Sequence, residues 1–247
     1  YFAKVFFPDG DQTAQLLNTA AVFGVGFFAR PVGAWLMGLY GDRVGRKAAM
    51  VASVSLMCFG SLIIALCPGY ETIGAWAPAI LVTARILQGV SMGGEYGTSA
   101  TYLSEMATEK RRGFYSSFQY VTLIGGQLSA MLVLIVLQKL VLTEQQLADW
   151  GWRIPFVIGA LLAVVAYRMR RDMPETEAFT RSTRRNGSLR TLLEHPREIA
   201  IVVGLTMGGT VAFYTYTTYM QKFLVNTSGF AKDTATLISA SALFLYM

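Results

Sequence analysis

The chain has 247 residues, of which 53% are hydrophobic and only 15% charged, and its mean hydropathy is +0.44. Soluble domains of this size rarely combine so little charge with so much apolar character. The formal net charge is +6, but the basic residues lie between hydrophobic stretches rather than on one soluble face, which argues against nucleic-acid binding.

Long uncharged stretches predict a series of membrane-spanning helices. A span needs about 20 mostly apolar residues, and uncharged runs of about this length cover 12–29, 48–70, 113–138 and 199–221. With the apolar stretches that a few charges interrupt, the expected spans are 17–40, 48–67, 77–104, 113–139, 151–170 and 196–221. The sequence therefore predicts an all-α, multi-pass membrane protein.

The two ends of the chain read as parts of further spans. Residues 1–7 resemble the tail of an earlier apolar helix, and residues 234–247 resemble the start of another. We therefore expect the chain to be part of a longer helical bundle, truncated at both ends.

The distribution of basic residues predicts the topology. Of the 21 Lys and Arg residues, 14 lie in three alternate loops, at 43–47, 110–112 and 168–197. Because cytoplasmic loops carry an excess of basic residues, we expect these loops on the cytoplasmic side. The polar segment 171–195 reads as a cytoplasmic linker between a membrane bundle at 1–170 and the start of a second bundle at 196–247.

The sequence gives little support to an enzyme or a metal protein. His195 is the only histidine, so a histidine-based zinc site or catalytic triad has no second member. Cys58 and Cys67 share one apolar span and are better explained as packing residues than as a disulfide or metal site. We therefore expect neither enzymatic activity nor a bound metal.

Two glycine patterns predict helix packing. Gly24-x-Gly26-x-x-Ala29 fits a dinucleotide-binding pattern, but no strand precedes it and it lies within an apolar span. Gly89, Gly93 and Gly97 are spaced by four residues and so lie along one side of a helix. Such a side has no bulk and lets a second helix approach closely.

Three charged residues lie inside the predicted spans, away from their ends: Arg30, Arg85 and Glu95. Each costs about 3 kcal/mol or more near the middle of a bilayer, so each should face a polar interior or a partner. Arg85 and Glu95 are about 15 Å apart along a helix and about 80° apart around it, so they can face one cavity at different depths. The alternative is that each pairs with a charge outside this chain or reaches an interface.

Several motifs resemble a known family. GLYGDRVGRK at 38–47 resembles the signature of the loop between helices 2 and 3 in the major facilitator superfamily. RILQG at 85–89 resembles the RxxQG element on the fourth helix of that superfamily. RPVG at 30–33 and GGEYG at 93–97 resemble its metabolite:proton symporter branch.

Longer stretches narrow this resemblance within the branch. The segments similar to members that carry α-ketoglutarate are 68–78, 113–128, 150–156 and 214–229. The resemblance implies twelve helices in two bundles that alternate access to a central site, with residues 1–7 ending helix 1. It implies a proton-coupled symporter of a dicarboxylate, α-ketoglutarate first, in the inner membrane. The alternatives are a symporter for citrate, shikimate or an osmolyte such as proline or betaine, or a non-transporting scaffold or sensor.

The resemblance also implies the partners. A symporter of this kind is driven by the proton gradient and has no bound cofactor. It works as a monomer surrounded by membrane lipid, with protons and a small organic acid as its partners.

Arginine suits a dicarboxylate because its planar fork binds carboxylates in a bidentate way. Arg85 is the first candidate for substrate binding and Arg30 the second. Hydrogen bonds to the substrate are expected from Tyr96, Gln119, Tyr120, Gln127, Tyr214, Tyr216, Thr217 and Tyr219. For the tyrosines, the alternative is ordinary packing with a satisfied hydroxyl.

Glu95 is the candidate for proton coupling, because it is the acid that lies well inside a predicted span. Burial and a nearby positive charge act on its protonation in opposite directions, as a switching group requires. By family resemblance, an acid on helix 1, outside this chain, is an equal candidate.

Asp42, Arg43, Arg46 and Lys47 are expected to form a cytoplasmic gate. Asp42 is expected to open the next helix and to cap it or to pair with a base on another helix. The alternative is a basic loop that only sets the topology.

Overall fold

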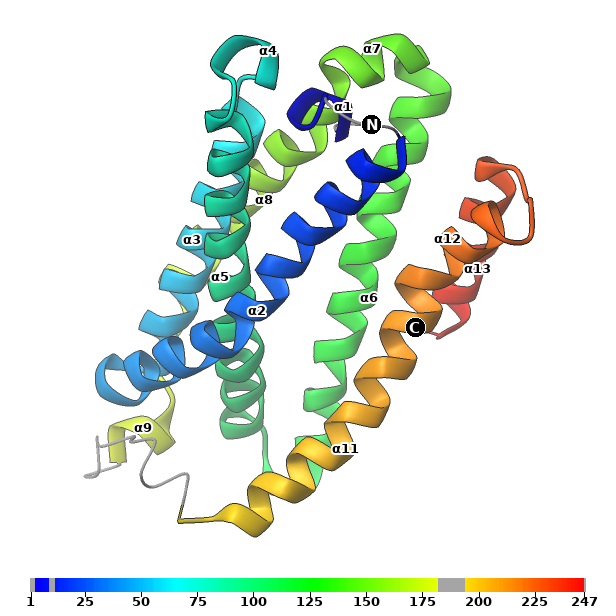
Figure 1. The fold of residues 1–247 in the computed structure, drawn as a ribbon. Coiled ribbons are helices and arrows are strands. Elements are labelled where there is room, and N and C mark those ends of the chain that lie inside the picture. The colour runs from blue at the N-terminus through cyan, green and yellow to red at the C-terminus, as the bar shows by residue number, and fades with distance from the viewer. Residues whose placement is uncertain (1–2, 9–11, 182–193, 247) are drawn as a thin grey trace. The chain divides into compact units, whose positions relative to one another are not determined.

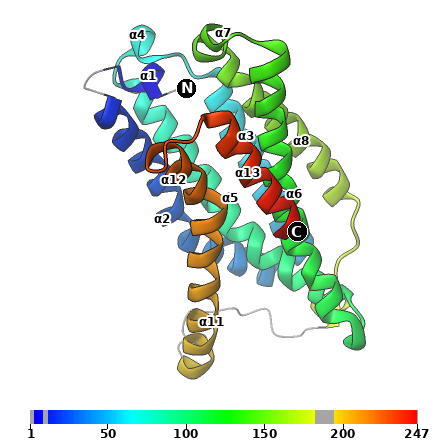
Figure 2. The same cartoon turned by 90° about the vertical axis from the view of Figure 1, so that its right-hand side faces the viewer.

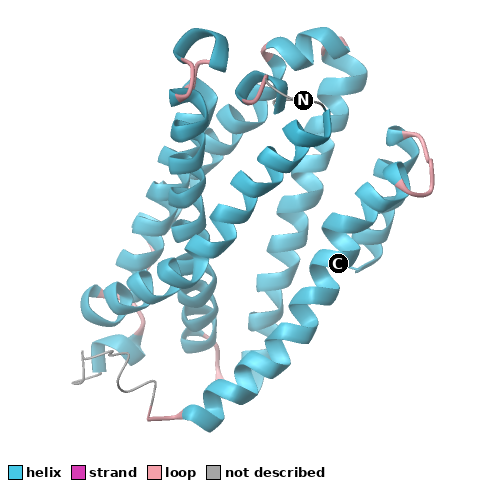
Figure 3. Ribbon diagram, viewed as in Figure 1, coloured by secondary structure: helices cyan, strands magenta, loops and turns pink. Residues whose placement is uncertain are grey.

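The computed structural model describes residues 3–8, 12–181 and 194–246. Every regular element in these three ranges is a helix, as Figure 3 shows by colour. The all-α prediction is confirmed, and helices follow the predicted spans with boundaries that differ by a few residues.

The chain forms two compact units, and each is described by itself. Unit 1 comprises Tyr1–Ser116 and Leu134–Gly187, and unit 2 comprises Ser117–Val133 and Ser188–Met247. The middle of α6 (Arg112–Val136) thus groups with the later helices. The boundary predicted at 170–171 stays a prediction.

The described part of unit 1 is built on four long helices (Figure 1): α2 (Gln12–Val44), α3 (Arg46–Leu66), α5 (Trp76–Met106) and α8 (Ile154–Arg171). Helix α5 packs along both α2 and α3, and α3 also packs along α8. The short elements of this unit are α1 (Ala3–Phe6), α4 (Tyr70–Ile73), η1 (Glu109–Arg111), η2 (Leu137–Val141), α7 (Glu144–Asp149), η3 (Gly151–Arg153) and α9 (Glu177–Arg181).

A single glycine separates α2 from α3. Gly45 has a φ of 129°, a backbone conformation that side chains with a Cβ rarely adopt. The chain reverses there between the last turn of α2 and the first turn of α3. The loop predicted at 43–47 is therefore only this one residue, and its neighbours are helical.

Glycines bring α2 and α5 into direct backbone contact. A Cβ added to Gly89 would collide with the carbonyl oxygen of Gly26, and one added to Gly93 would collide with that of Arg30. The predicted close approach at Gly89 and Gly93 is confirmed, whereas a Cβ at Gly97 would meet open space. Gly26, from the other glycine pattern, is thus a packing residue.

Within the described ranges, five helical segments are long and apolar enough to cross a membrane: Leu17–Val44, Arg46–Leu66, Arg112–Val141, Gly151–Arg171 and Pro196–Asn226. Helix α5 also has the length, with 31 residues and thus about 46 Å, but it is less apolar than these. Because α2 and α3 both pack along α5, some of its side chains contact these two helices instead of facing the outside of the unit. This position lets α5 carry Arg85, Gln88 and Glu95.

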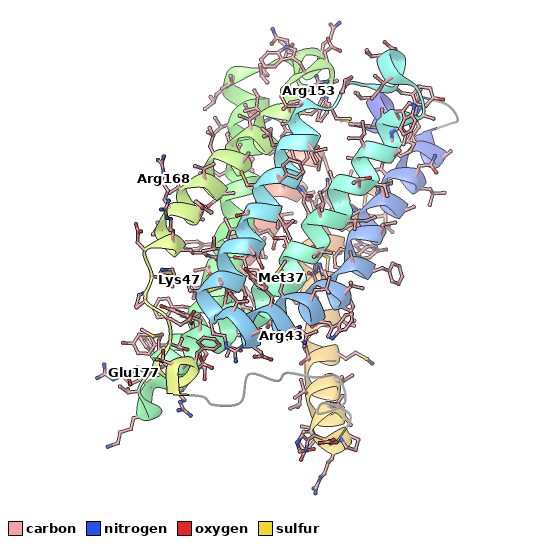
Figure 4. All side chains as sticks on the ribbon, turned by 90° about the vertical axis from the view of Figure 1, so that its left-hand side faces the viewer. Met37, Arg43, Lys47, Arg153, Arg168 and Glu177 are labelled. Atoms are coloured by element: carbon pink, nitrogen blue, oxygen red, sulfur yellow. The ribbon has the colours of Figure 1, made fainter. Side chains whose placement is uncertain are left out.

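The two ends of unit 1 differ in chemistry. At one end Phe6, Ile64, Leu81 and Trp152 form a buried apolar cluster. The other end, where α2, α5 and α8 finish and α3 begins, holds Arg43, Arg46, Lys47, Arg168, Arg170 and Arg171, and we call it the basic end. Figure 4 shows Arg153 at the apolar end and Arg43 and Glu177 toward the basic end.

Unit 2 contains Ser117–Val133 of α6, α11 (Pro196–Tyr214), η4 (Thr215–Tyr219), α12 (Met220–Asn226) and α13 (Lys232–Tyr246). Helices α12 and α13 pack together (Figure 2), and Gln221 donates from Nε2 to Thr236 Oγ1 at 2.8 Å. Element η4 is a π-helical turn inserted between α11 and α12. Such turns are rare and release backbone groups from the regular helical ladder.

Candidate functional site

Arg85 lies on α5 and is partly buried. Its Nη1 donates a hydrogen bond to Gln88 Oε1 at 3.0 Å, and its guanidinium carbon lies 5.8 Å from the ring centre of Phe156 on α8. Within the described residues no hydrogen bond is made by Nε or Nη2 of Arg85. The guanidinium is therefore held at one edge and can use its other edge for a ligand.

Gln88 connects Arg85 to a second helix. Its Nε2 donates to Ser61 Oγ on α3 at 3.1 Å. Ser61, Gln88 and Arg85 thus form a continuous line of polar side chains inside unit 1. The sequence placed Gln88 in a family element but gave it no role of its own.

Arg30 lies on α2, and its guanidinium stacks on Phe27, with 3.8 Å between its central carbon and the ring centre. Its backbone oxygen is the atom that a Cβ on Gly93 would strike. Arg30 and Arg85 therefore come from the two helices that the glycines hold together.

Glu95 forms an ion pair with a residue that sequence reasoning had assigned to a loop. Its Oε1 lies 2.5 Å from Nη2 of Arg170, in the last turn of α8. Nη1 of Arg170 donates to the carbonyl oxygen of Met50, near the start of α3, at 3.3 Å. Glu95 thus faces the basic end of unit 1, and one arginine ties α5, α8 and α3 together there.

Asp42 lies in the last turns of α2 rather than at the start of α3, so the expectation that it opens the next helix was wrong. It pairs with Arg46, four residues later. Nε of Arg46 also lies 3.7 Å from Glu105 Oε1 on α5. Arg46 therefore connects α2, α3 and α5 at the basic end.

Glu175 caps α3 in place of Asp42. Its Oε1 accepts from Arg46 N at 3.1 Å, and its Oε2 accepts from Lys47 N at 3.2 Å. The residue before the helix is Gly45, which has no side chain to cap it, and a carboxylate is favourable near the N-terminal N–H groups of a helix.

The segment around Glu175 has two further anchors. Thr176 Oγ1 donates to Glu105 Oε2 at 2.6 Å, and Tyr102 Oη donates to Pro174 O at 3.0 Å. From the sequence, this stretch is predicted only as part of a polar linker. The sequence offers two signals for this contact. The start of α3 follows a glycine that cannot cap it, and a segment rich in acids occurs later in the chain.

Two of the four predicted gate residues act differently from the expectation. Lys47 contributes its backbone N–H group to the Glu175 contact. Arg43 is exposed at the basic end and forms no ion pair with a described residue. Asp42 and Arg46 form an ion pair with each other, and both belong to unit 1.

The remaining predicted ligands lie in unit 2, except Tyr96, which is on α5. Gln127 Nε2 donates to the backbone oxygen of Thr217 at 3.2 Å, inside the π-helical turn η4. Thr217 is buried, whereas Tyr216 and Tyr219 are exposed, and Tyr214 packs edge-on against Phe213. Gln119 and Tyr120 lie on α6.

No group of three or more His, Cys, Asp or Glu side chains that could hold a metal occurs in the described ranges.

Residues 1–200 match the family model described as "Sugar (and other) transporter". The chain therefore belongs to this family of transporters, which is not a family of enzymes. The fold agrees with solved structures of the major facilitator superfamily. A D-xylose-proton symporter superposes with a TM-score of 0.71 at 19% identity, over 98% of this chain and 60% of that chain. A proton:xylose symporter bound to 6-bromo-6-deoxy-D-glucose gives 0.71 at 18% identity, over 99% and 62%.

Curated relatives are more similar in sequence. The alpha-ketoglutarate permease of Escherichia coli (strain K12) is 57% identical over 248 residues, which is 100% of this chain and 57% of the permease. A citrate-proton symporter of Klebsiella pneumoniae is 39% identical over 230 residues, 90% of this chain and 51% of that protein. The chain thus spans about half the length of these relatives. The resemblance to the α-ketoglutarate-carrying branch is confirmed.

Proposed function

We propose that this chain forms part of a proton-coupled symporter that imports a dicarboxylate, α-ketoglutarate first, by alternating access. The observation that carries the proposal is the 57% identity to alpha-ketoglutarate permease along the whole chain. The citrate and proline/betaine relatives are less similar, at 39% and 31%.

Arg85 is the proposed main ligand of the substrate. A dicarboxylate carries two negative charges, and its transfer into a low-dielectric interior needs a fixed positive partner. The edge of Arg85 that Gln88 does not occupy fits a carboxylate in a bidentate way. Arg30 is the second candidate, and the polar groups at Tyr96, Gln119, Tyr120, Gln127, Tyr214, Tyr216 and Thr217 are proposed to supply hydrogen bonds.

Glu95 is the proposed proton-coupling acid. Its ion pair with Arg170 gives proton transfer a structural consequence, because a protonated carboxyl loses most of its attraction for the guanidinium. Protonation would loosen the tie between α5 and α8 at the basic end. The proton gradient supplies the driving force, and no bound cofactor is required.

Asp42, Arg43, Arg46 and Lys47 are proposed to form the cytoplasmic gate, and we add Glu105 and Glu175 to it because of their contacts with Arg46. Contacts of this kind can bias inward-facing against outward-facing states when they break and re-form. The basic end then faces the cytoplasm with the linker 171–195, the protein lies in the inner membrane among lipid, and it acts as a monomer.

Uptake of labelled α-ketoglutarate tests this function. The protein, expressed at its full natural length, is reconstituted into proteoliposomes with and without an inward proton gradient. We expect gradient-dependent accumulation that C4 and C5 dicarboxylates compete for more strongly than shikimate or proline betaine. Equal competition by a zwitterion would remove the dicarboxylate assignment.

Citrate is the second candidate substrate, favoured by the 39% identity to citrate-proton symporters over 90% of the chain. In the same assay, stronger competition by citrate than by α-ketoglutarate would select it. The absence of any gradient-driven uptake of these acids would favour a scaffold or sensor.

A further inference from the structure

The line Ser61–Gln88–Arg85 crosses from α3 to α5, and the proposed function uses only Arg85. A guanidinium can only donate hydrogen bonds. The amide oxygen of Gln88 must therefore face Arg85, as observed at 3.0 Å. The amide nitrogen then faces Ser61, where a hydroxyl oxygen accepts at 3.1 Å. The chemistry of the three groups thus allows one orientation of the amide.

We propose that Gln88, locked by Ser61, is a positioning residue that fixes the Arg85 guanidinium before the substrate arrives. The inference rests on the proposed role of Arg85 in binding carboxylate. It adds that the affinity for substrate is set partly from α3, by a serine that touches no substrate.

The packing around Gln88 is consistent with this positioning role. A Cβ at Gly60 would lie 2.9 Å from Gln88 Cγ and 3.1 Å from the backbone oxygen of Ala84, so α3 and α5 are in close contact beside the amide. Ser61 is only 8% exposed. The glycine makes room for the stem of Gln88, and the neighbouring serine supplies the acceptor that sets its amide.

Loss of the hydrogen bond between Ser61 and Gln88 should affect substrate binding more than turnover. Without Ser61 Oγ the amide of Gln88 is held only by its hydrogen bond to Arg85, so its terminal torsion is less restricted and its oxygen holds the guanidinium less firmly. The arginine must then be ordered when the substrate binds, which costs affinity. Once the substrate is bound, the carboxylate itself orders the guanidinium, so the maximal rate should change little.

The test measures initial uptake of labelled α-ketoglutarate by proteoliposomes containing the full-length protein. For Ser61→Ala we expect KM to rise about 3- to 10-fold, which corresponds to about 0.7–1.4 kcal/mol, with a maximal rate near that of the parent. Ser61→Thr keeps a hydroxyl and should restore the lower KM.

Ser55→Ala is the matched control. Ser55 lies on the same helix, is exposed, and donates only to Val51 O of its own helix at 2.8 Å. Its substitution should leave KM unchanged. A drop in maximal rate and melting temperature at unchanged KM in Ser61→Ala would mean a purely structural serine and would overturn the proposal.

Double variants separate the failure of this inference from that of the proposed function. Ser61→Ala should add no further effect in a Gln88→Leu or an Arg85→Lys background, because the first removes the amide that Ser61 holds and the second removes the planar guanidinium that this amide positions. Unchanged KM in Arg85→Lys alone would refute the role of Arg85 in binding. A raised KM in Arg85→Lys with no effect of Ser61→Ala and Gln88→Leu would refute only the positioning role.

A second measurement is independent of transport. Phenylglyoxal labels guanidinium groups, and mass spectrometry of the peptide that contains Arg85 gives the rate. We expect Ser61→Ala and Gln88→Leu to raise this rate several-fold over Ser55→Ala. Equal rates in all three would overturn the positioning role whatever the substrate is.

Discussion

The carboxylate of Glu175 accepts a hydrogen bond from the backbone N–H group of Arg46, which lies 129 positions earlier in the chain. It also accepts from Lys47 N, so one side chain from after α8 satisfies the start of α3. This relationship places the beginning of the linker against the end of α2 and the start of α3 within unit 1.

Replacing Glu175 should destabilise the basic end. For Glu175→Ala we expect a loss of about 0.5–2 kcal/mol, the range for removing a helix cap, since two N–H groups of α3 lose their acceptor. The measurement is the melting temperature of the purified protein in detergent. Asp172→Ala, an exposed acid three residues earlier, is the control, and an equal shift in both variants would contradict the capping role.

Replacing Arg85 by lysine keeps the charge but removes the planar fork. We expect the affinity for α-ketoglutarate to fall by about 1–3 kcal/mol, with normal membrane insertion. Binding is measured by equilibrium dialysis or by competition in uptake. Arg168→Lys, at the end of α8, should bind normally, whereas normal binding by Arg85→Lys together with weak binding by Arg30→Lys would reverse the ranking of the two arginines.

Glu95→Gln separates proton coupling from structure. Glutamine keeps the size of the side chain but cannot release a proton, so gradient-driven accumulation should be lost while exchange of labelled for unlabelled substrate persists. If Glu95 serves only as the partner of Arg170, accumulation, exchange and melting temperature should all fall together. Retained accumulation would assign coupling to an acid outside this chain.

The glycine contacts offer a matched pair of substitutions on α5. Gly89→Ala should disrupt packing, because its Cβ would collide with the backbone oxygen of Gly26 and backbone atoms cannot rotate away. Gly97→Ala meets open space and should be tolerated, or stabilise the helix by about 0.5–1 kcal/mol. Expression level and melting temperature check both, and equal tolerance would contradict the close contact of α2 and α5.

Most of the helices could be predicted from the sequence because their cause is local. An apolar run of about 20 residues satisfies its own backbone as a helix, and small residues spaced by four share one side of it. The contacts of Gly89 and Gly93 with α2 follow from that spacing. The intramembrane positions of Arg30 and Arg85 were also visible, because a charge within an apolar run stands out against its neighbours.

The partners of these residues required the tertiary structure. Glu95 pairs with Arg170, and Glu175 caps α3, across separations of 75 and 129 positions. The role of Ser61 depends on how α3 lies against Gln88. Periodicity specifies which side of a helix a residue occupies, but the rotation and depth of two packed helices decide which side chains meet. The rotation and depth of these helices are set by the close contacts at Gly26, Gly60 and Gly89. The sequence alone does not rank the competing pairings of so many similar apolar helix surfaces.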